Sequence, residues 1–227
     1  NLKGGIGPRD EQSLEPYLDI GTMVKPIKKY GSFLVKFLRS KIGPLNLMTV
    51  LELGCGNGRL TYGLAPYVSK IYGVDPSDPM LEDAEKNRQH FPTVQGKVAF
   101  LKGTSENIPL DPSTTLDLII FGNSLHFSEE PLVALNNVWS YTKLNGYIFI
   151  IEPYLKFADK SITDKKFLRE DEKHLFNKAM YDDKQLKLKR ARDSVDSFIS
   201  ENIDRVEQIY RKFNDKKFWV ILRKVSQ

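Results

Sequence analysis

Apolar residues along the chain gather in short runs that alternate with stretches of helical spacing. Five runs have the length of strands, and they cover residues 48–53, 71–75, 98–101, 116–121 and 147–151. Because these runs are mostly continuous rather than alternating, they are typical of strands covered on both faces. Helical spacing predicts helices over residues 22–42, 59–65, 79–90 and 131–142. Strands that alternate with helices predict a parallel sheet with right-handed crossovers.

The pattern changes after Glu152. Residues 156–200 are highly charged and predict helices without a strand signal. Two strand candidates then follow: residues 203–213, which contain several apolar positions, and the strongly apolar run 218–222. The short segment between them suits a tight antiparallel connection. Upstream, Asp78 is the expected N-cap of the helix over 79–90, because Pro79 suits the first helical position.

Composition narrows the class of protein. Apolar residues make up 41% and charged residues 28%, an ordinary globular balance, and the net charge of +5 permits an anionic partner without requiring one. A single cysteine, Cys55, excludes an internal disulfide, and with three histidines it does not favour a zinc site, so no metal is expected. No apolar run approaches the ~20 residues of a membrane span. Without a signal-peptide pattern we expect a cytoplasmic protein, and a chain that begins at Asn1 rather than Met is consistent with an incomplete N-terminus.

A glycine loop follows the first predicted strand. Gly54, Gly56 and Gly58 are spaced more tightly than a dinucleotide loop requires, and Arg59 stands where the third dinucleotide glycine would be. Such a loop lets a ligand approach the backbone closely. Asp75 lies 21 residues after Gly54 at the end of the second strand, where a carboxylate can accept hydrogen bonds from ribose hydroxyls. The alternative interpretation is that Asp75 and the next residue, Pro76, form only a turn.

Residues 50–151 resemble the class I S-adenosylmethionine-dependent methyltransferases, in the broad small-molecule subgroup that includes quinone-biosynthesis enzymes. Val50–Gly58 is similar to the first motif of that family, Tyr72–Ser77 to its second, and Met80-Leu81 to the hydrophobic pair that follows. The segments Gly103–Leu110 and Phe121–His126 are similar to those after the third and fourth strands. This resemblance covers nearly half of the chain.

The resemblance implies S-adenosyl-L-methionine as cofactor and a doubly wound α/β fold. The sheet is expected to be mostly parallel and seven-stranded, with helices on both faces and the last strand antiparallel. The implied cofactor-binding residues are Glu52, Gly54, Cys55, Gly56, Asn57, Gly58, Asp75, Pro76, Met80, Thr104, Ser105, Glu106 and Asn123. Thr104 stands where the family usually has an aspartate that receives the adenine amino group, so the threonine hydroxyl or the Ser105 backbone is expected to replace part of that bond.

The resemblance also divides the chain into expected parts of a single domain. Residues 1–43 form an arm and a helix, 44–152 the cofactor-binding core, 153–200 a helical substrate or lid region, and 201–227 a pair of strands.

Candidate residues for chemistry follow the fourth and fifth strands, because open parallel sheets bind ligands beyond the carboxyl ends of their strands. His126 is the candidate general base, since histidine titrates near neutrality; the alternative is that it packs the loop. Glu152, Tyr154 and the arm residue Tyr17 are candidates for substrate contact. Cys55 is expected to be a small packed residue rather than a nucleophile.

The methyl acceptor is left open by the sequence, and so is the oligomeric state. A small molecule is the expected partner, an RNA or protein acceptor is the alternative, and a non-catalytic binding subunit is the third hypothesis. Residues 184–192 contain five basic residues and no acidic one. Such a run is typical of a solvated helix face, and the alternative is recognition of an anionic substrate, RNA or membrane surface.

Overall fold

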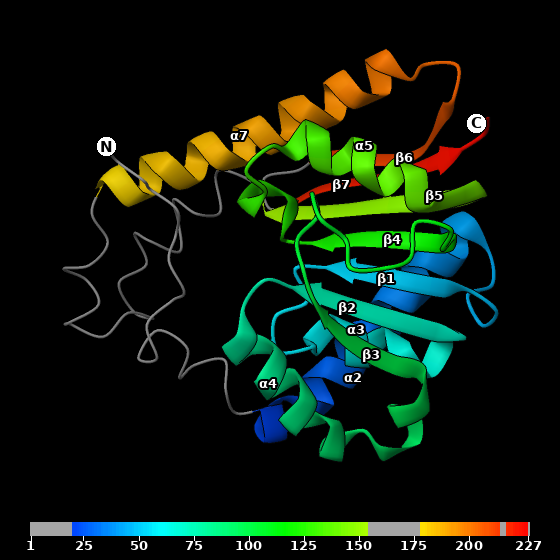
Figure 1. Ribbon diagram of the computed structural model, residues 1–227, viewed down its shortest axis with the longest axis vertical. Helices are drawn as coiled ribbons and strands as arrows, with labels where there is room; N and C mark the ends of the chain where they lie inside the picture. The colour runs from blue at the N-terminus through cyan, green and yellow to red at the C-terminus, as the bar shows by residue number, and fades with distance from the viewer. Residues whose placement is uncertain (1–19, 154–177, 214–216, 227) are drawn as a thin grey trace. The chain divides into compact units, whose positions relative to one another are not determined.

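The computed structural model describes residues 20–153, 178–213 and 217–226. Its strands form one seven-stranded sheet in the order β3-β2-β1-β4-β5-β7-β6 (Figure 1). The strands are β1 Thr49–Leu53, β2 Lys70–Asp75, β3 Val98–Lys102, β4 Leu116–Gly122, β5 Thr142–Pro153, β6 Val206–Phe213 and β7 Lys217–Lys224. β1 and β3 pair with β2 in parallel and β4 pairs with β5 in parallel, whereas β7 is antiparallel to both β5 and β6. The predicted sheet with its antiparallel last strand is therefore confirmed.

The described residues divide into two compact units, one that ends at Thr104 and one that begins at Ser105. The single domain expected from the sequence stays a prediction. None of the described helices is long and apolar enough to cross a membrane.

The first unit combines β1, β2 and β3 with three α-helices and three short 3-10 helices. These are α2 Ile20–Ile42, α3 Arg59–Leu64, α4 Asp78–Asn87, η1 Ala65–Tyr67, η2 Arg88–His90 and η3 Pro92–Lys97. The N-cap of α4 is Ser77, so the expectation that Asp78 caps this helix was wrong. Ser77 has the extended backbone that a cap requires, and its hydroxyl accepts from the Met80 amide. Asp78 is already helical, and its carboxylate pairs with Lys102 at 2.6 Å.

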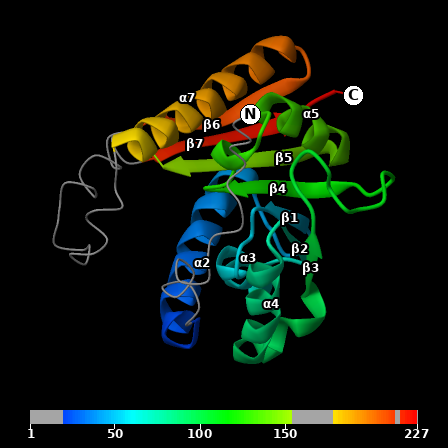
Figure 2. The same ribbon diagram turned by 60° about the vertical axis from the view of Figure 1, so that its left-hand side comes forward.

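The second unit combines β4 to β7 with α5 Pro131–Tyr141, α7 Lys178–Glu201 and the short η4 Leu125–Phe127. Both views show α7 running beside α5 (Figures 1 and 2). The rings of Trp139 on α5 and Phe198 on α7 meet edge to face with centroids 5.4 Å apart. α7 agrees with the later part of the helical region expected over 156–200, and residues 154–177 lie outside the described residues.

Strand β5 begins at Thr142, five residues earlier than the apolar run predicted. Leu116 of β4 pairs with Thr142, but Leu118 pairs with Tyr147, so the register shifts between them. Asn145 takes a left-handed φ of 64° in this irregular stretch. The apolar pattern missed it because polar residues occupy the bulged part of the strand.

The packing of α2 against α3 depends on two glycines in contact. A Cβ added at Gly31 would lie 2.1 Å from the carbonyl oxygen of Gly63. We expect Gly31→Ala to lower the free energy of unfolding by about 1–3 kcal/mol, because overpacking forces the two helices apart. Helix propensity alone predicts the opposite sign, a gain of about 1 kcal/mol.

Denaturant unfolding followed by circular dichroism measures this change. The matched control is Gly96→Ala, since nothing lies within 4 Å of a Cβ added at exposed Gly96. Equal stability of Gly31→Ala and the wild type would contradict the close contact.

Candidate functional site

The glycine loop of the first unit is held in place by the neighbouring strand. The amides of Gly54 and Cys55 both donate to the carbonyl of Val74, at 2.8 and 3.0 Å. Gly54, Gly56 and Gly58 all have left-handed φ angles, of 68°, 53° and 83°, which explains the choice of glycine. The loop therefore turns sharply between β1 and α3.

Two of the loop glycines have different surroundings. A Cβ at Gly58 would lie 2.8 Å from the ring of Phe100, so Gly58 packs inside the unit. Among the residues that the structure describes, a Cβ at Gly56 would meet only the Met80 sulfur, at 3.9 Å. With respect to these residues, the backbone of Gly56 faces space that a ligand can use.

Asp75, at the end of β2, connects this strand to the loop. Its Oδ2 accepts from the Gly56 amide at 2.8 Å, and its Oδ1 accepts from the Ser77 amide at 2.9 Å. The side chain is buried beside the loop, with the residue 8% exposed. A carboxylate oxygen has more than one acceptor position, so an oxygen that already accepts one hydrogen bond can accept another. The carboxylate shapes the loop, which is more than the simple turn of the alternative interpretation.

Glu52, on β1, is a second buried carboxyl group next to the glycine loop. It is buried at the end of β1, and the Thr61 hydroxyl of α3 donates to it. Burial, together with the charge of Asp75, raises the pKa of Glu52 to about 8, although the hydrogen bond from Thr61 acts to lower it. Burial, with the charge of Glu52, also raises the pKa of Tyr30 on α2. Glu52 is therefore mostly protonated at neutral pH. The sequence pattern gave no sign of this, because Thr61 and Tyr30 belong to other elements.

The other predicted residues of the first unit differ in exposure. Cys55 is buried, and burial raises the pKa of its thiol well above the ordinary value, which disfavours the reactive thiolate. Asn57 is buried, and its carbonyl accepts from the Asn87 side chain at 3.3 Å. Met80 is half-buried, whereas Pro76 and Thr104 are exposed.

Ser105 and Glu106 open the second unit in a network of polar groups. The hydroxyls of Ser105 and Ser128 lie 2.8 Å apart, and the Ser105 hydroxyl also donates to Glu106 Oε2 at 3.0 Å. Asn137 of α5 donates to the Ser105 carbonyl at 2.8 Å. Arg190 of α7 donates to the Ser128 carbonyl at 2.9 Å. Ser128, Asn137 and Arg190 were not predicted, because their roles depend on helices that meet only in the folded chain.

His126 and Glu152 lie together at the carboxyl ends of β4 and β5. Asn123 follows β4 and is exposed. Its amide donates to the Ile151 carbonyl at 2.7 Å, and its left-handed φ of 61° turns the chain. His126 Nδ1 then lies 2.5 Å from Glu152 Oε2, and the Leu125 amide donates to Glu152 Oε1 at 2.7 Å. Each of the two residues is 2% exposed. Glu152 therefore contacts the histidine, whereas the sequence suggested contact with substrate.

The second ring nitrogen of His126, Nε2, differs from Nδ1 in its hydrogen bonding. Nε2 is buried, and within residues 20–153, 178–213 and 217–226 no group forms a hydrogen bond with it. A buried polar atom without a partner costs about 1–3 kcal/mol, and such atoms are uncommon in native proteins.

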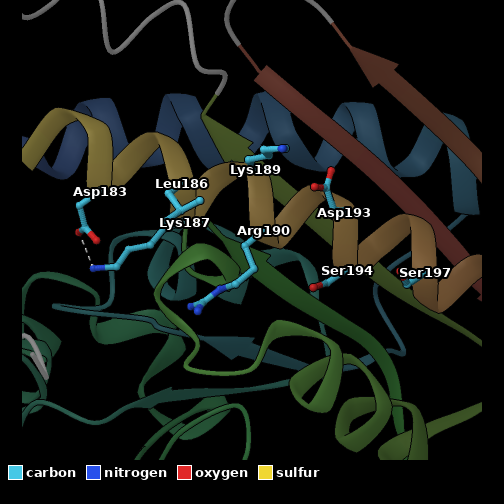
Figure 3. A pocket seen from close by; sticks show the side chains of 8 residues that line it. All are labelled: Asp183, Leu186, Lys187, Lys189, Arg190, Asp193, Ser194 and Ser197. Atoms are coloured by element: carbon cyan, nitrogen blue, oxygen red, sulfur yellow. Dashed lines mark ion pairs between the residues drawn. The ribbon is translucent and has the colours of Figure 1, made fainter. Parts of the chain in front are cut away.

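The basic run lies on α7 along a groove of about 410 Å³. The side chains that line the groove are Asp183, Leu186, Lys187, Lys189, Arg190, Asp193, Ser194 and Ser197 (Figure 3). Lys187 pairs with Asp183 at 2.7 Å, and Arg192 pairs with Asp193 at 3.1 Å. Acidic residues that flank the run thus balance part of its charge, which favours a solvated helix face over a nucleic-acid surface.

Two predicted substrate residues, Tyr17 and Tyr154, lie outside the described residues. In the part of the chain that the structure describes, no group of three or more histidine, cysteine or acidic residues could hold a metal ion.

Comparisons with known proteins agree on one family. A family model described as a methyltransferase domain matches residues 45–216. The cypemycin N-terminal methyltransferase of a Streptomyces species is 29% identical over 145 residues, which cover 62% of this chain and 54% of that protein. The mitochondrial ubiquinone biosynthesis O-methyltransferase of Candida albicans is 26% identical over 152 residues, covering 66% of this chain and 46% of that protein. The chain thus spans about half the length of these relatives.

Solved structures share the fold. The plantazolicin methyltransferase, solved with S-adenosylhomocysteine, has a TM-score of 0.68 at 13% identity and covers 95% of this chain and 90% of its own. A methyltransferase from Aquifex aeolicus has a TM-score of 0.60 at 22% identity and covers 88% of this chain and 98% of its own. Together with the family model, which matches well over half of the chain, these findings show that the chain belongs to the methyltransferase domain family.

Proposed function

We propose that this protein transfers a methyl group from S-adenosyl-L-methionine to a small-molecule acceptor. The observation that carries the proposal is the glycine loop, in which the Asp75 carboxylate holds the Gly56 amide and, among the described residues, only the Met80 sulfur lies within 4 Å of a Cβ built at Gly56. A cofactor with a ribose and an amino-acid end needs such a loop beside a carboxylate. S-adenosylmethionine supplies a methyl group on an activated sulfonium, so much of the rate can come from positioning the acceptor.

The residues of the first unit fit this cofactor. Among the described residues, the backbone of Gly56 leaves room for a ligand, and Asp75 is proposed to accept from ribose hydroxyls. The Met80 sulfur lies beside the same space. In the second unit, Ser105, Glu106 and Asn123 remain the proposed cofactor contacts. The cytoplasmic location also remains a prediction.

A peptide or protein acceptor is the second candidate, because one relative is named an N-terminal methyltransferase. An RNA acceptor has less support, since acidic side chains pair with part of the basic run on α7. Binding to RNA that weakens steeply with salt would favour an RNA acceptor.

Calorimetric titration with S-adenosylhomocysteine tests the cofactor. We expect saturable one-site binding to the folded protein, and a folded protein without measurable binding would overturn the proposal. Incubation with methyl-labelled S-adenosylmethionine and separate pools of phenols, amines and peptides then tests the acceptor. Transfer of the labelled methyl group to the peptide pool alone would favour a peptide or protein acceptor.

A further inference from the structure

We propose that Glu152 is a positioning residue that holds His126 in the tautomer whose Nε2 removes a proton from the acceptor. This proposal rests on the methyl transfer proposed above. It extends that function to an acceptor whose nucleophilic oxygen or nitrogen arrives with a proton attached. Glu152 acts through the histidine and does not itself contact the acceptor.

The two oxygens of Glu152 already have donors. Oε1 accepts from the Leu125 amide at 2.7 Å, and that backbone donor cannot reverse its role. Oε2 faces His126 Nδ1 at 2.5 Å. An ionised carboxylate only accepts, so Nδ1 carries the proton and Nε2 carries the lone pair.

Nε2 is the atom that remains available. It is buried, and none of the described residues hydrogen bonds with it. The ring of Phe127 lies against the imidazole with centroids 3.9 Å apart and restricts its rotation. An acceptor that brings an O–H or N–H group to Nε2 would satisfy this orphaned lone pair.

Glu152 provides a partner for the imidazolium that removal of a proton from the acceptor would form. Its Oε2 lies against Nδ1, and its Oε1 accepts from the Leu125 amide. After transfer, imidazolium and carboxylate form an ion pair, in which each charge has its partner in a region of low dielectric.

In methyl transfer to a hydroxyl acceptor, the proton and the electron pairs each have a destination. The O–H proton goes to Nε2, and the acceptor oxygen uses its electron pair to bond the methyl carbon as the sulfur–carbon bond breaks. S-adenosylhomocysteine keeps the pair of electrons from that bond. The imidazolium later returns the proton to solvent, so no oxidant or further reactant is needed.

Glu152→Gln tests the tautomer with no substrate present. The fixed Leu125 donor requires the oxygen of glutamine, which turns the NH₂ group toward Nδ1. Nδ1 must then accept, and the proton moves to Nε2. Long-range proton–nitrogen NMR of the protein with labelled histidines should show Nδ1–H in the wild type and Nε2–H in Glu152→Gln. His126→Asn assigns the signal, and His90→Gln, at an exposed position, is the control.

An Nε2–H tautomer in the wild type, or an unchanged tautomer in Glu152→Gln, would overturn the positioning role. A merely structural glutamate would not reverse the two nitrogens. Because this readout needs neither cofactor nor acceptor, it is independent of the proposed methyl transfer.

Turnover tests the removal of the proton. The probes are para-methoxyphenol, which stays protonated in mildly alkaline buffer, and para-nitrophenol, which is largely ionised there. We expect Glu152→Gln and His126→Asn to lower transfer to para-methoxyphenol about 100-fold, a typical general-base contribution. Transfer to para-nitrophenol and the affinity for S-adenosylhomocysteine should change no more than about twofold, since neither needs a base.

Equal loss with both phenols would show a structural role and reject the base. A wild type that binds S-adenosylhomocysteine but methylates neither phenol would reject proton removal from a hydroxyl acceptor. Loss of S-adenosylhomocysteine binding in the wild type would instead reject the proposed function and leave the tautomer result standing.

Discussion

Asp75→Ala is expected to weaken the binding of S-adenosylhomocysteine about 100-fold. The carboxylate is proposed to accept from the ribose hydroxyls, and hydrogen bonds to a charged group contribute roughly 1.5–3 kcal/mol each. The same substitution removes the acceptor from the Gly56 and Ser77 amides. The loop then loses one of its links to β2 as well as its proposed contact with the ligand, while the bonds from Gly54 and Cys55 to Val74 remain.

Calorimetry with two ligands separates these two losses. The wild type should bind S-adenosylhomocysteine more tightly than its 2′-deoxy analogue, and Asp75→Ala should discriminate much less between them. Asp78→Ala is the matched control, because Asp78 is an exposed carboxylate on the same segment whose partner is Lys102. Equal discrimination by the wild type and Asp75→Ala would show that Asp75 only shapes the loop.

Glu52 is expected to make the ligand-free protein less stable as pH rises from about 5 to 8. Its pKa is about 8 in the folded chain against an ordinary 4.5, so the folded state holds a proton that the unfolded state has lost. Stability falls wherever the folded state binds more protons. The stabilisation is complete below the unfolded pKa, is lost progressively toward pH 8, and changes no further above it. At 1.36 kcal/mol for each pKa unit, the total loss is roughly 4–5 kcal/mol.

Glu52→Gln should remove this dependence, because glutamine does not titrate and can still accept from the Thr61 hydroxyl. Denaturant unfolding at several pH values measures the difference in slope between the two proteins. Glu82→Gln, an exposed position on α4, should keep the wild-type slope. Parallel curves for the wild type and Glu52→Gln would contradict the raised pKa.

Much of the fold followed from local pattern. Continuous apolar runs placed β1 to β5 and β7, because strands covered on both faces need apolar residues throughout, whereas charged residues interrupt β6. The predicted ends of helices and strands were wrong where polar residues set them. Ser77 rather than Asp78 caps α4, and β5 extends back to Thr142 through a bulge of polar residues. Hydrophobic periodicity contains no signal for either feature.

The candidate site likewise contains residues that the sequence pattern identified and residues that it did not. Gly54, Gly56, Gly58 and Asp75 could be recognised because a left-handed turn and a carboxylate at a strand end leave a spacing in the sequence. The partners of Ser105 could not be recognised. Ser128 reaches it from a loop and Asn137 from α5, while Arg190 of α7 donates to the Ser128 carbonyl, and no local rule links such distant positions.

The sequence by itself thus determined the glycine loop, the acidic residue at the end of β2 and the alternation of strands and helices that builds the sheet, since each depends on the conformation of neighbouring residues. Only the tertiary structure decided which side chains became partners. It buried Glu52 and raised its pKa, and it joined Glu152 to His126 across 26 residues of chain. The physical reason is that burial and pairing depend on the register and packing of separate elements, which create low-dielectric surroundings that no single segment contains.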